Sequence, residues 1–245
     1  MLEVDQVSKE FHGLKAIDEV SFHVPRGSIT SLIGPNGAGK TTLINLITGV
    51  LPPTRGAIRV GGADLRGWSP HRIARHGVRR TFQTVRLFHG LTVRENLLLG
   101  RIDSLRGRLS LWLPMAMGDR DGRRRADEVL AMLGLSHLAD EVATDLPYGT
   151  QRRVEIARVL MGQPMFALLD EPAAGMNEGE TAQLVDDVRQ IRDQGITVLL
   201  VEHDMSMVMA VSDQVVVLNF GRKISEGTPA EVQRDPEVIK SYLGE

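Results

Sequence analysis

The sequence predicts an α/β fold whose parallel sheet is interrupted by a helical insertion. Two patterns indicate this arrangement. After residue 164, apolar strands alternate with amphipathic helices, which is typical of a parallel sheet. From about residue 88 to residue 163, helical periodicity dominates and strand signals are lost. We therefore expect the stretch 88–163 to be inserted into an α/β unit formed by the residues on either side of it.

The N-terminal part is predicted to contain strands and one helix. Strands are expected at VSFHV (20–24) and SITSLI (28–33), and a hairpin at AIRV (57–60) and GGADL (61–65). Apolar residues at helical spacing, followed by a glycine, predict a helix over residues 40–48.

The insertion is predicted to contain several helices. Thr92 and Glu95 have the spacing of a capping box and indicate a helix start. A second amphipathic helix is expected over 121–135. In LPYGTQRR (146–153), a proline and a glycine end the preceding element, and a run with helical spacing opens at the following Gln-Arg-Arg. Residues 101–120 are irregular and match no pattern.

The C-terminal part returns to alternating strands and helices. Strands are predicted at 166–170, 196–201 and 214–219, and helices at 178–195 and 205–212. Thr228 and Glu231, with a proline between them at the first helical position, predict one more helix start.

The composition is that of a globular chain. Of its 245 residues, 42% are hydrophobic and 24% charged, and the net charge of −2 does not call for nucleic acid as a partner. The absence of cysteine excludes disulfides, thiolate metal sites and a cysteine nucleophile. We expect no signal peptide, and no apolar run approaches the roughly 18 residues that span a bilayer. Any work at a membrane is therefore expected to go through a partner.

GPNGAGKTT (34–42) is the strongest motif in the chain. It lies between an apolar strand and a helix, and it matches the pattern G-x-x-x-x-G-K-[ST]. Its glycines let successive backbone N–H groups face one anion, to which the helix N-terminus adds partial positive charge. Lys40 is expected to neutralise β and γ phosphate oxygens, and Thr41 to hold Mg²⁺ through its hydroxyl. The predicted nucleotide-binding residues of this loop are Gly34, Pro35, Asn36, Gly37, Ala38, Gly39, Lys40, Thr41 and Thr42.

Asp170 and Glu171 end the predicted strand FALLD. An aspartate there fits the Mg²⁺-side carboxylate of P-loop ATPases, and the next glutamate can polarise an attacking water. The alternative is an acidic pair that only ends a strand before a proline turn; the phosphate loop upstream favours the ATPase interpretation.

Gln83 and His203 are weaker signals. A single histidine at a strand end is usually structural. However, His203 follows ITVLLV, which we expect to lie beside FALLD in the sheet. The side chains of Gln83 and His203 are therefore expected to face one γ-phosphate.

These motifs, in this order, resemble the ATP-binding subunits of ABC transporters over nearly the whole chain. The matching residues are the adenine-stacking aromatic Phe11, the Q-loop glutamine Gln83, the Walker B aspartate Asp170, the catalytic glutamate Glu171, the D-loop 173–177 and the switch histidine His203. The resemblance implies a single α/β domain, 1–245, with a P-loop NTPase (RecA-like) core, an N-terminal antiparallel β subdomain and an inserted α-helical subdomain. The core is assigned to 1–87 and 164–245, and the insertion to 88–163.

LPYGTQRR lies where this family has its LSGGQ signature, which caps the γ-phosphate of an ATP bound to the partner subunit. Gly149 and Thr150 are thereby assigned to that second nucleotide. Pro147 replaces the signature serine, Tyr148 replaces the first signature glycine, and Asn177 stands where the D-loop aspartate is usual. Since Gly149 and the following backbone N–H groups remain, we expect a glycine turn at a helix N-terminus to serve as the anion site.

The resemblance also implies a mechanism, with ATP and Mg²⁺ as cofactors. Mg²⁺ is expected on Thr41 and Gln83, with Asp170 supporting the ion. Glu171 orients or deprotonates the attacking water, and His203 contacts the γ-phosphate and senses its loss. Gln83 and its loop pass the movement to a permease.

The chain more closely resembles the larger of the two paralogous ATPases of branched-chain (hydrophobic) amino-acid importers. The stretches that carry this resemblance are PHRIARHGVRRTFQTVRLF, LPYGTQRRVEIAR, LLDEPAAGMN, VEHDM and SYLGE. The partners implied are two permeases, a paralogous second ATPase (or a second copy when the chain is isolated) and, indirectly, a periplasmic binding protein, without nucleic acid. The chain is expected at the cytoplasmic face of the bacterial inner membrane. Residues 84–100 are expected to receive a permease coupling helix, with Leu87 and Phe88 exposed; alternatively, both pack inside the helical region.

Three other interpretations remain open. The importer could carry another cargo, such as urea, another amide or a lipid component. A soluble ABC-type ATPase of DNA repair or the ribosome would usually carry a long coiled coil or two cassettes, and this chain has neither. A binding module that switches without hydrolysis is disfavoured by Glu171 and His203.

Overall fold

The computed structural model describes residues 1–101 and 120–243. The stretch that matched no pattern, 101–120, thus lies almost wholly outside the described residues.

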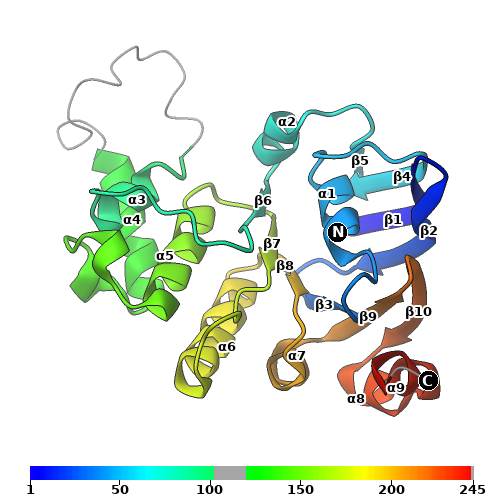
Figure 1. Ribbon diagram of the computed structural model, residues 1–245. Coiled ribbons are helices and arrows are strands. Elements are labelled where there is room, and N and C mark those ends of the chain that lie inside the picture. Colours follow the sequence, from blue (N-terminus) through cyan, green and yellow to red (C-terminus); the bar gives the residue numbers. More distant parts are fainter. Residues whose placement is uncertain (102–119, 244–245) are drawn as a thin grey trace.

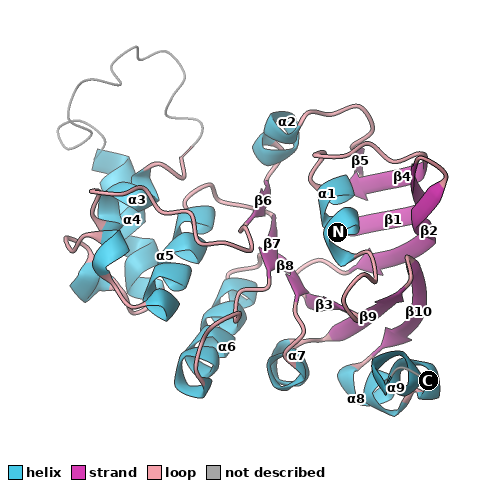
Figure 2. Cartoon of the chain, viewed as in Figure 1, coloured by secondary structure: helices cyan, strands magenta, loops and turns pink. Residues whose placement is uncertain are grey.

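Within the described residues, the chain forms a central sheet and an antiparallel sheet (Figures 1 and 2). The central sheet has the order β10-β9-β3-β8-β7-β6; all its neighbours are parallel except β10, which is antiparallel to β9. The antiparallel sheet has the order β2-β1-β4-β5. The strands are β1 (Leu2–Phe11), β2 (Leu14–Val24), β3 (Ile29–Ile33), β4 (Arg55–Val60), β5 (Ala63–Asp64), β6 (Val78–Arg80), β7 (Phe166–Asp170), β8 (Thr197–Val201), β9 (Gln214–Asn219) and β10 (Arg222–Gly227).

Helices lie on either side of the central sheet, and α3, α4 and α5 form a group beyond its β6 end (Figure 1). The helices are α1 (Lys40–Ile47), α2 (Pro70–Arg75), α3 (Val93–Leu98), α4 (Arg120–Met132), α5 (Tyr148–Leu160), α6 (Glu178–Asp193), α7 (Met205–Val211), α8 (Pro229–Arg234) and α9 (Pro236–Leu243).

Strand β8 shows why the central strands are continuously apolar. Val198 and Leu200 pack in a cluster with residues of α3 to α7, whereas Leu199 and Val201 pack in a second cluster with α1 and the antiparallel sheet. Successive side chains of a strand point to opposite faces. Because both faces are covered, every position of this strand is buried.

The predicted strands and helices are confirmed, with shifted ends. The predicted hairpin is β4–β5, and the two expected capping boxes, at Thr92 and Thr228, are both formed. A further capping box joins Asn177 to Glu180 at the start of α6. Asn177, which stands where the D-loop aspartate is usual, therefore caps α6. Asparagine and aspartate are both favoured at this N-cap position.

Two local expectations were wrong. Gly149 is not in a turn ahead of the helix: α5 begins at Tyr148, with Pro147 as its N-cap, and Gly149 is its second residue. Leu87 is only 9% exposed, because it packs among the apolar residues of the helical group, including Val93 and Leu97. Phe88, at 52%, is exposed as expected.

None of the helices within residues 1–101 and 120–243 combines the length and apolar character needed to cross a bilayer.

Candidate nucleotide site

The loop from Gly34 to Gly39 joins β3 to α1 in a conformation that depends on glycine. Gly34, Gly37 and Gly39 have φ values of 150°, 81° and 101°, a region that residues with a Cβ rarely adopt. At Gly34 the space is also missing, because a Cβ would lie 2.1 Å from the Leu218 carbonyl oxygen. The loop is therefore held close against the end of β9.

Neighbouring segments hold the other end of the loop. The Gly221 N–H, in the turn between β9 and β10, donates to the Ala38 carbonyl at 3.0 Å. A Cβ on Gly39 would lie 2.8 Å from the carbonyl oxygen of Ala16, on β2. The antiparallel sheet and the β9–β10 turn thus form one wall of the loop.

Helix α1 presents free backbone donors to this loop. Its N-cap, Gly39, has no side chain with which to bond the first-turn N–H groups. These groups therefore stay available to an anion, and the helix dipole favours negative charge at the same place. Lys40, the first residue of α1, is mostly buried, and its Nζ donates to the carbonyl oxygens of Gly34 at 2.5 Å and Pro35 at 3.1 Å.

Lys40 lies in the electrostatic field of both predicted carboxylates. Burial lowers the pKa of Lys40, while the negative charges of Glu171 and Asp170 act in the opposite direction. The phosphate loop follows β3 and the carboxylates follow β7. Because both strands run parallel to β8, which lies between them, the loop and the carboxylates leave the sheet at the same edge.

Glu171 directly follows β7 and is held in an unusual backbone conformation. Its φ of 45° is left-handed, which costs a residue other than glycine about 1–3 kcal/mol. Its N–H donates to the Val201 carbonyl at 2.8 Å. Its carboxylate accepts a hydrogen bond of 2.9 Å from Gln83 Nε2. Two of the predicted catalytic side chains are thus in direct contact.

Asp170 is held by an arginine that sequence reasoning missed. Arg80, the last residue of β6, donates from Nη2 to Asp170 Oδ2 at 2.7 Å and from Nη1 to Asn45 Oδ1 at 2.7 Å. The Asp170 N–H donates to Thr81 Oγ1 at 3.0 Å. The available signal was the position of Arg80 three residues before Gln83, at the end of a strand.

Thr41, Gln83 and Asp170, the residues expected to hold Mg²⁺, offer oxygen ligands, which suit this hard cation. Thr41 is exposed in the first turn of α1. Asp170 is buried, and Arg80 occupies Oδ2 but not Oδ1. No group of three or more His, Cys, Asp or Glu side chains forms a metal site in the described part of the chain. One carboxylate with a hydroxyl and an amide fits a Mg²⁺ that takes its remaining ligands from phosphates and water.

His203 follows β8, the strand next to β7, and its side chain is 61% exposed. The preceding residue, Glu202, is fully buried and was also missed. Its carboxylate accepts hydrogen bonds from the backbone N–H groups of Ala173, His203 and Asp204. Burial raises the pKa of Glu202, and these hydrogen bonds act in the opposite direction. Glu202 therefore ties the segment after Glu171 to the segment that carries the histidine.

Phe11 lies at the end of β1, where the strand turns into β2. Its ring is 38% exposed, and Lys9 Nζ lies 5.1 Å from the ring centroid. Phe11 pairs with Leu14 of β2, and Ala16 of the same strand borders Gly39, so Phe11 lies on the pair of strands next to the phosphate loop.

The structure does not bring Gly149 and Thr150 to the phosphate loop of the same chain. Figure 1 shows α5 among the helices beyond β6, far from α1. The N-cap of α5, Pro147, makes no side-chain hydrogen bond to the first turn, so the first N–H groups remain available. Within the chain this helix start lies against the first turn of α6, because a Cβ on Gly149 would lie 2.4 Å from Glu180 Oε1.

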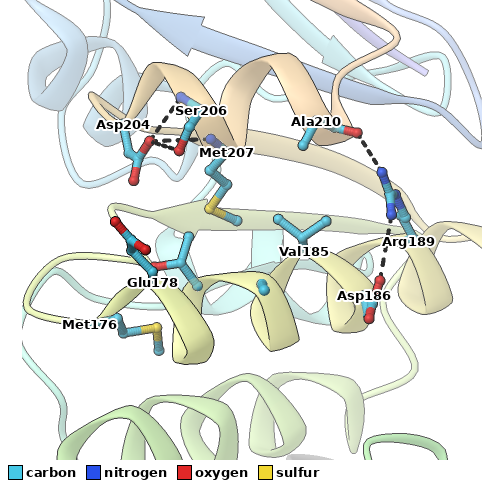
Figure 3. A pocket seen from close by; sticks show the side chains of 11 residues that line it. Met176, Glu178, Val185, Asp186, Arg189, Asp204, Ser206, Met207 and Ala210 are labelled. Carbon is cyan, nitrogen blue, oxygen red and sulfur yellow. Dashed lines mark hydrogen bonds and ion pairs between the residues drawn. The ribbon is translucent and has the colours of Figure 1, made fainter.

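A groove of about 490 Å³ lies between α6 and α7 (Figure 3). Its walls are formed by residues such as Met176, Val185 and Met207, with Glu178 and Asp204 at one end. This groove borders the segment after His203 and is separate from the phosphate loop.

A glycine-rich loop at a helix N-terminus, facing a carboxylate pair at the end of a parallel strand, defines a P-loop nucleotide-binding domain. The family model described as "ABC transporter" matches residues 17–174, and the one described as "Branched-chain amino acid ATP-binding cassette transporter" matches 222–245. The chain therefore belongs to the ABC transporter family and has the ATP-binding cassette fold and ATPase chemistry of that family.

Curated relatives match over the full chain. The high-affinity branched-chain amino acid transport ATP-binding protein BraF of Pseudomonas aeruginosa is 44% identical, covering 100% of this chain and 98% of the relative. LivG of Escherichia coli, with the same description, is 43% identical with the same coverage.

Solved structures of ABC transporter cassettes also match over most or all of the chain. A nucleotide-free ATP-binding cassette from an ABC transporter is 35% identical with a TM-score of 0.89, covering 100% of this chain and 99% of that one. A dimeric bacterial ABC transporter cassette is 26% identical with a TM-score of 0.79, covering 94% and 99%.

Proposed function

We propose that this chain is the ATP-hydrolysing subunit that powers import of branched-chain and other hydrophobic amino acids through partner permeases. One observation carries the hydrolytic part: Lys40 of the phosphate loop lies in the field of Asp170 and Glu171, and Glu171 is in turn hydrogen-bonded to Gln83. A loop that grips phosphates next to a positioned carboxylate is suited to in-line attack by water.

The proposed role of Glu171 is to orient or deprotonate that water. A positioned general base accelerates a reaction by about 10²–10⁴-fold. Gln83, which already contacts the carboxylate, supports its orientation and shares the γ-phosphate end of the site. His203, exposed at the end of the next strand, is the proposed contact to the γ-phosphate, and Phe11 the proposed platform for adenine.

Thr41, Gln83 and Asp170 are the residues we propose for Mg²⁺. The ion would neutralise charge that develops on the β and γ phosphate oxygens. Within the chain, Arg80 keeps Asp170 oriented through one carboxylate oxygen and leaves the other available.

We further propose that the start of α5 serves a second cassette. Its uncapped first turn lies far from the phosphate loop of its own chain (Figure 1). A related cassette of similar fold has been solved as a dimer, which supports the pairing of two cassettes that this proposal requires. The second cassette would be a paralogue or a second copy. The permeases and a periplasmic binding protein complete the proposed importer, and the exposed Phe88 marks the proposed contact to a permease at the membrane face.

The cargo is proposed from the match over residues 222–245 and the names of the 43–44% identical relatives. The test is uptake of labelled leucine, isoleucine and valine by cells that lack this chain and are complemented with the wild type or with Glu171→Gln. Only the wild type is expected to restore uptake. Restored uptake of labelled urea or acetamide without that of leucine would overturn the proposed cargo while leaving the motor function in place.

A further inference from the structure

Arg152 is a fully buried side chain that binds the main chain on both sides of Glu171. Nη2 donates to the carbonyl oxygens of Asp170 and Glu171, both at 2.8 Å, and Nε donates to that of Pro172 at 3.3 Å. Arg152 itself lies in the second turn of α5 and is 0% exposed. A single guanidinium thus holds three consecutive peptide groups around the catalytic carboxylate.

The same guanidinium also reaches the loop that carries Gln83. Nη1 donates to the carbonyl oxygen of Phe82, the residue directly before Gln83. Gln83 in turn bonds to the Glu171 carboxylate. Arg152 therefore fixes the backbones of two residues whose side chains meet at the reaction site.

The charge of Arg152 is balanced in the interior by Glu155, whose Oε2 lies 2.8 Å from Nη1. Burial raises the pKa of Glu155, while the positive charges of Arg152 and Arg158 act in the opposite direction. Buried ion pairs are a poor source of stability, because well-packed apolar residues often serve as well or better. A stabilising role in anchoring α5 therefore does not by itself explain why Arg152 and Glu155 are buried together.

The backbone of Glu171 supplies that explanation. Its left-handed φ of 45° persists only where surrounding contacts hold it. Hydrogen bonds to the carbonyl groups of Asp170, Glu171 and Pro172 restrain the peptides around this torsion. The planar, rigid fork of an arginine suits the task, whereas a lysine offers a single charged point on a flexible stem.

We propose that Arg152 is a positioning residue that sets the direction of the Glu171 carboxylate and links it to the start of α5. Because α5 begins at Tyr148, one turn before Arg152, a rotation of this helix start would move the guanidinium and the peptides that it holds. When the start of α5 contacts the nucleotide of a second cassette, Arg152 would thus transmit that contact to the position of Glu171 in its own chain. The inference rests on the proposed function of Glu171.

The test compares Arg152→Lys and Arg152→Gln with the wild type and with a matched control, Arg153→Gln. Arg153 is the next residue of α5 and pairs with the buried Asp187 through a hydrogen bond of 2.6 Å from Nε to Oδ2. The control therefore also breaks an arginine–carboxylate pair of α5, but one that is not bonded to Glu171. We measure thermal unfolding, the Kd of ATP and the ATPase kcat and KM of each variant.

Both Arg152 variants are expected to bind ATP within about twofold of the wild-type Kd and to lose about tenfold or more in kcat, the signature of an interaction used in the chemical step. Arg152→Lys should retain the folded structure even if Arg152→Gln does not, because it keeps the charge opposite Glu155. Arg153→Gln should keep kcat within about threefold at a comparable loss of Tm.

A wild-type kcat in folded Arg152→Lys would overturn the inference, as would equal losses of kcat in Arg152→Lys and Arg153→Gln at equal Tm. The wild type separates the two proposals. If the wild type binds ATP but does not hydrolyse it, either alone or in the assembled complex, the proposed function of Glu171 fails. If the wild type and the Arg152 variants hydrolyse ATP at the same rate, only the role of Arg152 fails.

Discussion

Gln83 and Glu171 are 88 positions apart in the chain, yet Gln83 Nε2 donates a hydrogen bond of 2.9 Å to Glu171 Oε2. The contact forms because β6 and β7 are parallel neighbours, so the residues that follow them leave the sheet at the same edge. A side chain proposed to report to the permease thus touches the side chain proposed to activate water.

The first prediction concerns Glu171→Gln. This variant keeps the size of the side chain but removes the base, so ATP binding should persist while turnover falls by about 10²-fold or more. Phosphate release and equilibrium ATP binding measure the two properties. Glu237→Gln, an exposed substitution on α9, should change neither. Wild-type turnover in Glu171→Gln would show that another group activates the water.

Lys40→Ala tests the phosphate loop. The substitution removes the charge that Asp170 and Glu171 face and the hydrogen bonds to Gly34 and Pro35. We expect ATP affinity or turnover to fall by about tenfold or more, which corresponds to about 1.4 kcal/mol. The control is Lys240→Ala, on the exposed face of α9. Unchanged affinity and unchanged turnover in Lys40→Ala would remove this loop from the site.

Gly149 tests the proposed contact of α5 with a second nucleotide. Gly149→Asp would place a carboxylate at the α5 start, and it should spare ATP binding but abolish hydrolysis in the assembled complex. In this chain the new side chain would also collide with Glu180, whose Oε1 would be 2.4 Å from the added Cβ. The variant is therefore made in a Glu180→Ala background, which removes that collision at the cost of a capping-box contact worth about 1 kcal/mol.

Glu180→Ala alone is the reference for that experiment, and it should retain most of the ATPase activity. If the double variant is as active as this reference in the assembled complex, the start of α5 is only the beginning of a helix.

The fourth prediction is a pH dependence from Glu202. Because burial raises its pKa in the folded chain, protonated Glu202 stabilises the fold below its unfolded value of 4.5. This contribution is lost as the pH rises through the folded pKa. The Tm of Glu202→Gln relative to wild type should therefore increase as the pH rises above 4.5, and each kcal/mol of difference shifts Tm by about 2–4 °C.

The readout is the slope of this Tm difference and not its level, since Gln cannot accept all the backbone hydrogen bonds that Glu202 accepts. A flat difference for Glu202→Gln would contradict the raised pKa.

Much of the fold could be predicted because its signals are local. The phosphate loop, the strand FALLD and the capping boxes at Thr92 and Thr228 each depend on residues within a few positions of one another. Exposure was less predictable. Leu87 and Phe88 are adjacent and both apolar, and only the packing of the helical group decided that Leu87 is buried and Phe88 exposed.

The sequence by itself determined the glycine loop, the carboxylates and the candidate glutamine and histidine, because each belongs to a short motif beside its own strand or helix. Tertiary structure decided which of these meet and what holds them. Arg80 on Asp170, Arg152 on the carbonyl groups around Glu171, and Glu202 on the Ala173 N–H are contacts between elements or between loops. They depend on β6, β7 and β8 lying side by side in the sheet, an order set by packing of both sheet faces.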